Sequence, residues 1–272
     1  INSVYGLINA GYKDFLFVDV TGRNDWSSAL ATPTRAANVS FFYPSVSSSF
    51  ILSNVLDLPS YFSFAKLRAS VAQVGNDTDP YQTTGAFVAS TPYASQPTFT
   101  DQNFIANANL LPEKTSSIEF GADLRFFKDR LNVDVTYYDA RTQNQIISLP
   151  VPISSGYTQQ VVNGGLVRSR GLEVMLGVVP IIKEEFQWSS FFNFSKNVST
   201  VNEIPAGLDN LTLAYNRLYD NVNQTVWVQV EEGGRIGDLY GTGYKKTDDG
   251  QFILDANGNY IVDNDLRKLG NY

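Results

Sequence analysis

The chain has 272 residues, of which 43% are hydrophobic, 13% aromatic and 17% charged, enough apolar material for one sizeable core or one long apolar band. It contains neither cysteine nor histidine, which excludes disulfides, thiolate nucleophiles, cysteine-based zinc sites and histidine general bases. Its net charge of −7 argues against a nucleic-acid partner, because phosphate binding requires clustered lysine and arginine.

The first two patterned segments alternate apolar and polar residues, which is the period-two pattern of a β-strand with one apolar and one polar face. In the first segment the apolar residues are Pro44, Val46, Phe50 and Leu52, set against the polar residues Ser45, Ser47 and Ser49. In the second segment Leu67, Ala69 and Val71 alternate with Lys66, Arg68 and Ser70. The stretch between them, Val55 to Phe62, is compatible with a helical turn.

The strongest pattern runs from Ser117 to Tyr137 and predicts an antiparallel hairpin. Apolar residues occupy every second position, namely Ile118, Phe120, Ala122, Leu124 and Phe126, then Leu131, Val133, Val135 and Tyr137. The polar alternates are Glu119, Asp123 and Arg125 in the first arm and Asn132, Asp134 and Thr136 in the second. A short charged turn, Lys128, Asp129 and Arg130, joins the two arms.

Two later segments follow the same rule, so we predict an all-β chain. One segment has apolar residues at every second position, with Glu173 among the alternates: Leu172, Val174, Leu176 and Val178. In the other, the apolar residues are Trp188, Phe192 and Phe194, and the polar alternates are Ser189, Asn193 and Ser195. The spacing of an amphipathic helix is nowhere sustained for more than about two turns. We expect about seven or eight strands of roughly 10 to 13 residues, and a two-residue hairpin turn at Asn257 and Gly258.

The predicted connections alternate between short and long. The short ones lie near residues 11–14, 54–63, 128–130 and 180–187, and the long ones near 23–40, 75–114, 141–168 and 199–265. Outer-membrane barrels keep short turns on the periplasmic side and long loops outside, whereas a soluble sandwich has no reason to sort its loops by length. This alternation favours a membrane barrel.

Periodicity alone does not say whether the apolar face contacts lipid or forms the core of a soluble sandwich. Aromatic residues gather at strand ends, as in the girdles of a membrane barrel, at Phe41 to Tyr43, Phe126 and Phe127, Tyr137 and Tyr138, and Phe186 and Trp188. Ordinary packing of aromatics at hairpin ends is the alternative. Strands of the predicted length match a tilted bilayer crossing, which favours lipid.

Six segments of the chain, in collinear order, form a recognisable set. The first three are DVTGRNDWSS at 19–28, FFYPSVSSSFILS at 41–53 and FAKLRASVAQVGNDTDPY at 64–81. The other three are LPEKTSSIEFGADLRFFKDRLNVDVTYYDARTQNQI at 111–146, NGGLVRSRGLEV at 163–174 and EGGRIGDLYGTGY at 232–244. These segments resemble SusC/RagA-type TonB-linked outer-membrane transporters, and the resemblance covers nearly the whole chain.

The resemblance implies an antiparallel transmembrane β-barrel of roughly 22 strands in the outer membrane, with long extracellular loops and a plug domain inside. It also implies import of oligosaccharides or peptides, energised by TonB through an N-terminal region, and a SusD-like surface lipoprotein as partner. Residues 1–272 contain neither the plug nor the TonB box and stop before the last strands. We expect one barrel segment, surrounded by outer-membrane lipid.

Exposed aromatics in the long loops are the candidate contacts for a sugar, a peptide or the partner lipoprotein. They are Trp26, Tyr81, Tyr93, Phe99, Tyr157 and Tyr240. For any single one of them, internal packing that keeps a long loop ordered is the more favoured interpretation.

No catalytic, cofactor or metal site is predicted. The run from Asp255 to Asp263 resembles a calcium loop, but Gly258 comes early and Leu266 stands where a bidentate glutamate is needed. The acidic cluster at 76–79 precedes a proline and fits a turn. Glu184 and Glu185 are sequence neighbours in a charged turn, and 232–235 lacks the spacing of a phosphate-binding loop.

The primary hypothesis is therefore a segment of a TonB-dependent nutrient importer that carries out no bond chemistry. A soluble secreted all-β domain that binds or hydrolyses carbohydrate is the alternative from another class, because glycosidases need only paired carboxylates. A third possibility is a structural barrel subunit of a larger envelope complex.

Overall fold

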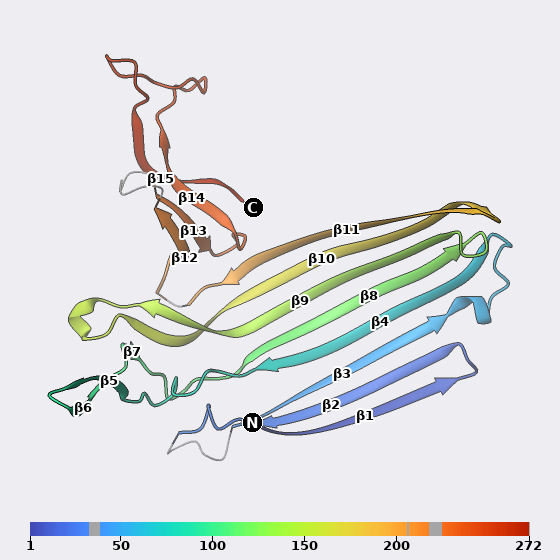
Figure 1. The fold of residues 1–272 in the computed structure, drawn as a ribbon, viewed down its shortest axis with the longest axis horizontal. Helices are drawn as coiled ribbons and strands as arrows, with labels where there is room; N and C mark the ends of the chain where they lie inside the picture. Colours follow the sequence, from blue (N-terminus) through green and yellow to red (C-terminus); the bar gives the residue numbers. More distant parts are fainter. Residues whose placement is uncertain (33–38, 206, 218–224, 272) are drawn as a thin grey trace. The chain divides into compact units, whose positions relative to one another are not determined.

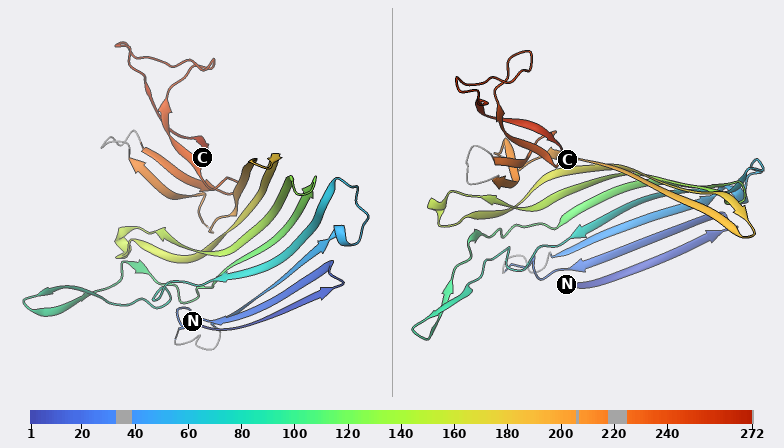
Figure 2. Two further views of the ribbon diagram at one scale, coloured as in Figure 1. Left: turned by 45° about the vertical axis from the view of Figure 1, so that its right-hand side comes forward. Right: turned by 45° about the horizontal axis from the view of Figure 1, so that its top comes forward.

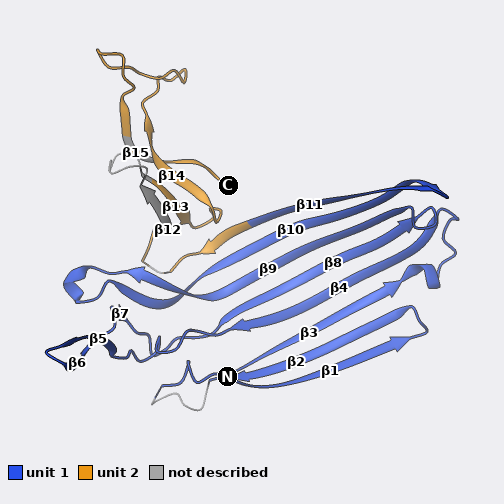
Figure 3. Ribbon diagram, in the orientation of Figure 1, with its two compact units in different colours: residues 1–198 blue, residues 199–272 orange. Residues whose placement is uncertain are grey.

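A computed structural model describes residues 1–32, 39–205, 207–217 and 225–271. The chain divides into two compact units, Ile1–Val198 and Ser199–Tyr272 (Figure 3). The described residues form fifteen strands and two short 3-10 turns, which confirms the all-β prediction but exceeds the predicted number of strands. Among these residues no helix is long and apolar enough to cross a membrane.

The first unit is built on one sheet, drawn as a single layer in Figure 1. Its eight long strands pair antiparallel, each with the next long strand along the chain. In order across the sheet these strands are β1 (Asn2–Tyr12), β2 (Leu16–Trp26), β3 (Ser40–Ile51), β4 (Phe62–Asn76), β8 (Glu113–Phe126), β9 (Leu131–Pro150), β10 (Gln159–Lys183) and β11 (Phe186–Glu203). The last residues of β11 are counted with the second unit. The sheet is curved, as Figure 2 shows.

The predicted hairpin at 117–137 is confirmed as β8 and β9, paired from Phe126–Leu131 to Lys114–Gln143. Its turn holds Phe127, Lys128 and Asp129 at positive φ, a conformation that a tight reversal requires. The 3-10 turn η1 spans Leu52–Asn54, just before the predicted 55–62. Leu52, predicted as a strand residue, therefore lies outside β3.

Two predictions about length are wrong. The strands β9, β10 and β11 have 20, 25 and 18 residues, well above the expected 10 to 13. The expected long loop at 141–168 is mostly sheet, because β9 and β10 stay paired up to Pro150 and Gln159 and leave only 151–158 between them. Both faces of this extension carry polar residues, so the backbone ladder continues where hydrophobic alternation no longer marks it.

The end of the sheet that carries the longer connections holds the small buried core of the first unit. It contains Leu30, Leu110 and Val161, with Val39, Phe41, Phe104 and Ile146 packed against them. The connection after β4 includes a separate hairpin of β5 (Val88–Tyr93) and β6 (Gln96–Thr100). The two-residue strand β7 (Phe104–Ile105) pairs in parallel with β10, and the 3-10 turn η2 spans Ile153–Ser155. Hydrophobic burial thus stabilises the loops.

The second unit contains four antiparallel strands where the sequence predicted one long loop at 199–265. They are β12 (Asn210–Arg217), β13 (Thr225–Glu231), β14 (Asp238–Tyr244) and β15 (Val262–Asn271). β14 carries three residues without a large side chain, Gly241, Thr242 and Gly243, so it has little alternation to detect. Register shifts interrupt its pairing with β15.

The turn predicted at Asn257 and Gly258 is one residue longer than expected. Leu254 bridges Tyr260, and the amide of Gly258 donates to the carbonyl of Asp255 at 3.0 Å. Gly258 has φ of +82°, which is the glycine position of a three-residue hairpin loop. The arms form isolated bridges rather than continuous strands.

Gly171 makes room for a tyrosine ring and provides a test of the packing between β9 and β10. It lies opposite Tyr138, and a Cβ at 171 would fall 2.3 Å from the ring carbon Cζ. We expect Gly171→Val to destabilise the full-length protein by about 1–3 kcal/mol in urea unfolding from lipid vesicles. Tyr138→Ala should recover part of this loss in the double variant. Gly6→Val, where a Cβ meets nothing within 4 Å, is the matched control, and an equal loss there would contradict the explanation.

Candidate functional site

The strand register sorts the side chains of the first unit onto two faces. Residues that pair directly across strands point to the same side of a sheet. One rung joins Arg68, Gly121, Thr136 and Glu173, and the next joins Ala69, Phe120, Tyr137 and Leu172. Because successive rungs point to opposite sides, the sheet has one polar and one apolar face.

The apolar face is not covered within the first unit. Ile118 and Phe120 are 46% and 57% exposed, and Leu124, Val133 and Val135 are half-buried. A water-soluble sandwich would bury these side chains against a second layer of sheet. The buried core cluster of this unit instead lies under its loops. The apolar face is therefore available to contact lipid.

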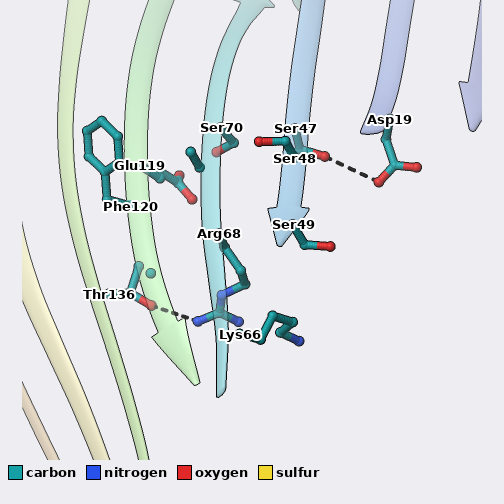
Figure 4. A pocket seen from close by; sticks show the side chains of 12 residues that line it. Asp19, Ser47, Ser48, Ser49, Lys66, Arg68, Ser70, Glu119, Phe120 and Thr136 are labelled. Atoms are coloured by element: carbon teal, nitrogen blue, oxygen red, sulfur yellow. Dashed lines mark hydrogen bonds between the residues drawn. The ribbon is translucent and has the colours of Figure 1, made fainter. Parts of the chain in front are cut away.

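The polar face is hollowed, and this hollow is the candidate site (Figure 4). Its volume is about 410 Å³, and it spans strands β2, β3, β4, β8 and β9. The lining residues are Asp19, Ser47, Ser48, Ser49, Lys66, Arg68, Ala69, Ser70, Glu119, Phe120, Gly121 and Thr136. Of these, Ser48, Ala69 and Phe120 belong to one rung of the apolar face, so they border the hollow while their side chains point to the other side of the sheet. A hollow that extends over five strands places the concave side of the curved sheet on its polar face.

Arg68 crosses the hollow from β4 to β9. Its guanidinium donates to Oδ1 of Asp134 at 2.7 Å. It also donates to Oγ1 of Thr136 at 3.2 Å, the contact drawn in Figure 4. Gly121 on the intervening strand β8 leaves the necessary space, since a Cβ there would lie 2.8 Å from Nε of Arg68. The Arg68 side chain remains 40% exposed, so the guanidinium also faces the open hollow.

The remaining lining groups offer hydrogen bonds of both kinds. Oγ of Ser47 donates to Asp19 at 3.3 Å, and Asn9 also donates to that carboxylate. Glu119 is exposed and takes part in no ion pair with the described residues. Clustered serine hydroxyls can donate or accept, so this surface suits a neutral, hydroxyl-rich or amide-rich ligand.

A second polar group lies beside the hollow, nearer to the short turns. Asp123 is between two cations, with Nζ of Lys66 at 3.8 Å and Nε of Arg125 at 3.5 Å. The guanidinium of Arg125 also stacks on Phe64, 4.9 Å from the ring centroid. These contacts involve partly exposed groups and hold the polar face together only modestly.

The structure does not gather all six predicted aromatic contacts in one place. Tyr93 and Phe99 share the β5–β6 hairpin and are 80% and 64% exposed. Trp26 ends β2 and is 42% exposed, Tyr81 is 61% exposed, and Tyr157 is half-buried in the connection after β9. Tyr240 lies in β14 of the second unit and is half-buried.

Aromatic side chains at the short-turn end of the sheet pack against one another. The rings of Phe62 and Phe126 lie 4.6 Å apart, and Tyr61 and Phe127 extend this group. Phe186 and Trp188 are 57% and 52% exposed. Mutual packing of some aromatic rings and exposure of others therefore occur together at this end.

The two acidic runs that resemble ion sites support turns. Asp255 accepts hydrogen bonds from the amides of Asn257 and Asn259, both at 2.8 Å. The backbone and side chain of Asn259, with the backbone of Asn257, hold the pKa of Asp255 below its ordinary 3.8. Asp77 accepts from Ser27 and from the amide of Thr78. Both carboxylates thus stabilise local loop structure.

Sequence reasoning missed the hollow, although it predicted the polar face. Ser47 and Ser49 were expected on that face, but Asp19 was not considered, and neither was Ser48, which pairs with Ala69 in a rung of the apolar face. Asp19 could have been found from its position, because Asp19 lies opposite Ser47 once β2 and β3 are paired in register.

Comparison with known proteins relates the chain to one family. Residues 2–269 match the family described as TonB dependent receptor-like, beta-barrel. A TonB-dependent receptor of Formosa agariphila is 27% identical over 263 residues, which is 95% of this chain and 26% of the relative. TonB-dependent receptor SusC of Bacteroides thetaiotaomicron is 24% identical over 218 residues, which is 76% of this chain and 21% of SusC. The chain thus spans about a quarter of the length of these relatives.

The solved structures extend this similarity to the fold. The structure of the RagAB peptide transporter aligns with a TM-score of 0.79 and 21% identity, over 98% of this chain and 30% of that one. A second structure, of the RagAB peptide importer in its open-open state, aligns with a TM-score of 0.74 over 98% of this chain and 29% of that one. At 20% to 21% identity these alignments establish a shared architecture.

Proposed function

This chain belongs to the TonB dependent receptor-like β-barrel family, and from that membership we propose that it forms part of the wall of a transporter that imports oligosaccharides or peptides. Proteins of this kind are outer-membrane β-barrels, which is the location of the chain. The observation that carries the proposal is the pair of faces: an apolar face without a covering layer, and a concave polar face with a hollow of about 410 Å³.

The proposed mechanism is passage through a lined interior, without bond chemistry. Serine hydroxyls, Arg68 and Glu119 offer weak and exchangeable hydrogen bonds, which let a polar cargo move along a wall instead of holding it tightly. A plug domain outside residues 1–272 would close the barrel, and TonB would act on the plug through an N-terminal region.

The choice of cargo and partner rests on the relatives. One relative is named SusC, and a structure of the same fold is described as the RagAB peptide transporter. These names support an oligosaccharide or a peptide as the cargo and a SusD-like lipoprotein as the external partner. The exposed aromatics of the β5–β6 hairpin suit contact with either one, since such rings stack on sugars and on protein surfaces alike.

Uptake by cells that express the full-length parent protein tests this function. We expect labelled oligosaccharide or peptide to accumulate in the periplasm, and accumulation to stop when the proton-motive force is collapsed. Arg68→Ala removes the contact between the Arg68 guanidinium and the Asp134 carboxylate, the only one described between β4 and Asp134. We expect the uptake rate to fall several-fold, because one charged hydrogen bond is lost. Arg125→Ala, outside the hollow, should leave uptake near its original rate.

Two results would contradict the proposal. Uptake that continues without the proton-motive force would exclude TonB-driven import. Recovery of the parent protein in the aqueous fraction of cells, without detergent, would exclude a membrane barrel altogether.

A further inference from the structure

A group of cations lies on the lipid side of the sheet, directly beyond the apolar rungs. The next rung on the same face as Phe120, Tyr137 and Leu172 joins Ile118, Asp139 and Arg170. The following rung on the same face joins Ser116, Arg141 and Arg168, and the next one contains Lys114 opposite Gln143. We call Lys114, Arg141, Arg168 and Arg170 the outer basic cluster.

Asp139 is the carboxylate that pairs with this cluster, and it contacts two of the four cations. Arg168 donates hydrogen bonds to both carboxylate oxygens of Asp139, with Nε at 2.9 Å from Oδ1 and 3.1 Å from Oδ2. Nε of Arg170 reaches Oδ2 of the same residue at 3.3 Å. With four cations and one anion, the cluster keeps an excess of three positive charges (4 − 1 = 3).

The register also sets two like charges against each other. Arg141 lies directly opposite Arg168, and like charges in that position destabilise a sheet. In the described part of the chain neither Arg141 nor Lys114 has a carboxylate within ion-pair distance. Arg141, Arg170 and Lys114 are exposed. An anion between these side chains would relieve the repulsion and satisfy their free donors.

The position of the cluster indicates which anion. It borders the apolar face and lies toward the end of the sheet that carries the longer connections, which in an outer-membrane barrel is the outside. Side chains one rung beyond the apolar band lie at the depth of lipid headgroups, where long cationic side chains extend toward phosphate. A dissolved anion would gain nothing from the apolar rungs below, whereas a lipid would cover them with its acyl chains.

We propose that the outer basic cluster binds the phosphate groups of phosphorylated lipids in the outer leaflet. The planar guanidinium groups of Arg141 and Arg170 suit bidentate contact with phosphate oxygens. This inference rests on the outer-membrane location of the chain and is independent of which cargo the transporter carries.

Native mass spectrometry of the full-length protein in nanodiscs tests the proposal. Discs would contain either bisphosphorylated lipid A or the same lipid with its phosphates removed. We expect phosphorylated lipid A to be retained at least about tenfold more, which corresponds to about 1.4 kcal/mol. The double variant R141Q/R170Q should lose this preference. It keeps the contact between Arg168 and Asp139, so the strands can still pair.

The control is Lys128→Gln, which removes a cation from the exposed turn between β8 and β9 at the other end of the sheet and should retain lipid normally. Equal retention of the two lipids by the original protein would overturn the proposal, as would an unchanged preference in R141Q/R170Q. Uptake is not part of this measurement, so a failure here leaves the transport proposal standing, and a failure of transport leaves the lipid site standing.

Discussion

Phe120→Arg is expected to destabilise the barrel by about 2–4 kcal/mol, whereas Ser117→Arg on the same strand should cost less than about 1 kcal/mol. Phe120 belongs to an apolar rung and is 57% exposed, so in the membrane its side chain contacts lipid tails. At that depth the guanidinium of an arginine either loses its hydrating water or brings water into the lipid, and both cost free energy. Ser117 points to the polar face, between Ala72 and Ala140, where an arginine can remain hydrated.

The measurement is equilibrium urea unfolding of the full-length protein from lipid vesicles. The two sites are three residues apart on one strand and receive the same side chain. A difference between their losses of unfolding free energy therefore arises from the face of the sheet on which each site lies. Similar losses at the two sites would mean that lipid does not cover the apolar face, and the membrane interpretation would be wrong.

Replacing both Tyr93 and Phe99 by alanine is expected to raise the substrate concentration for half-maximal uptake, or to weaken capture of the partner lipoprotein, by about 30- to 1,000-fold. The two side chains are 80% and 64% exposed on one hairpin, and aromatic anchors in binding surfaces are each worth about 1–2 kcal/mol or more. Because neither ring is buried, barrel stability should not change.

Concentration-dependent uptake and co-purification of the surface partner distinguish the two possible contacts. Val88→Ala in the same hairpin is the matched control, since it trims an exposed apolar side chain that offers no ring to stack on. If the double variant leaves both readouts unchanged, the hairpin aromatics only order their loop, which was the competing interpretation from the sequence.

The parts of the fold that could be predicted are those where lipid and water demand opposite side chains. Between Ser117 and Tyr137 every second residue must be apolar, so the pattern and the turn at Lys128 are plain in the sequence. Beyond Asp139 that demand ends, and β9 continues through Gln143 and Leu149, paired with β10, without an apolar face to mark it. Their hydrogen-bonded ladder persists because backbone pairing does not depend on side-chain polarity.

The candidate site was less predictable for a different reason. Alternation assigns a residue to a face, but it does not say which residues on other strands become its neighbours. The contact of Arg68 with Asp134 spans 66 positions in sequence and depends on the empty space at Gly121. The aromatic candidates illustrate the same limit: Tyr93 and Phe99 share a hairpin, while Tyr240 belongs to the other compact unit.

The extension of β9 and β10 past the outer basic cluster determines the height at which the 151–158 connection meets its surroundings. From Arg141 to Pro150 the strand advances roughly nine residues, and at ~3.3 Å each it rises ~30 Å along its own axis. The buried contacts of Ile146 and Val161 with Leu110 brace this ribbon at its upper part. The 151–158 connection therefore lies well beyond the apolar rungs of the sheet, at the end of a hydrogen-bonded ribbon that these buried contacts support.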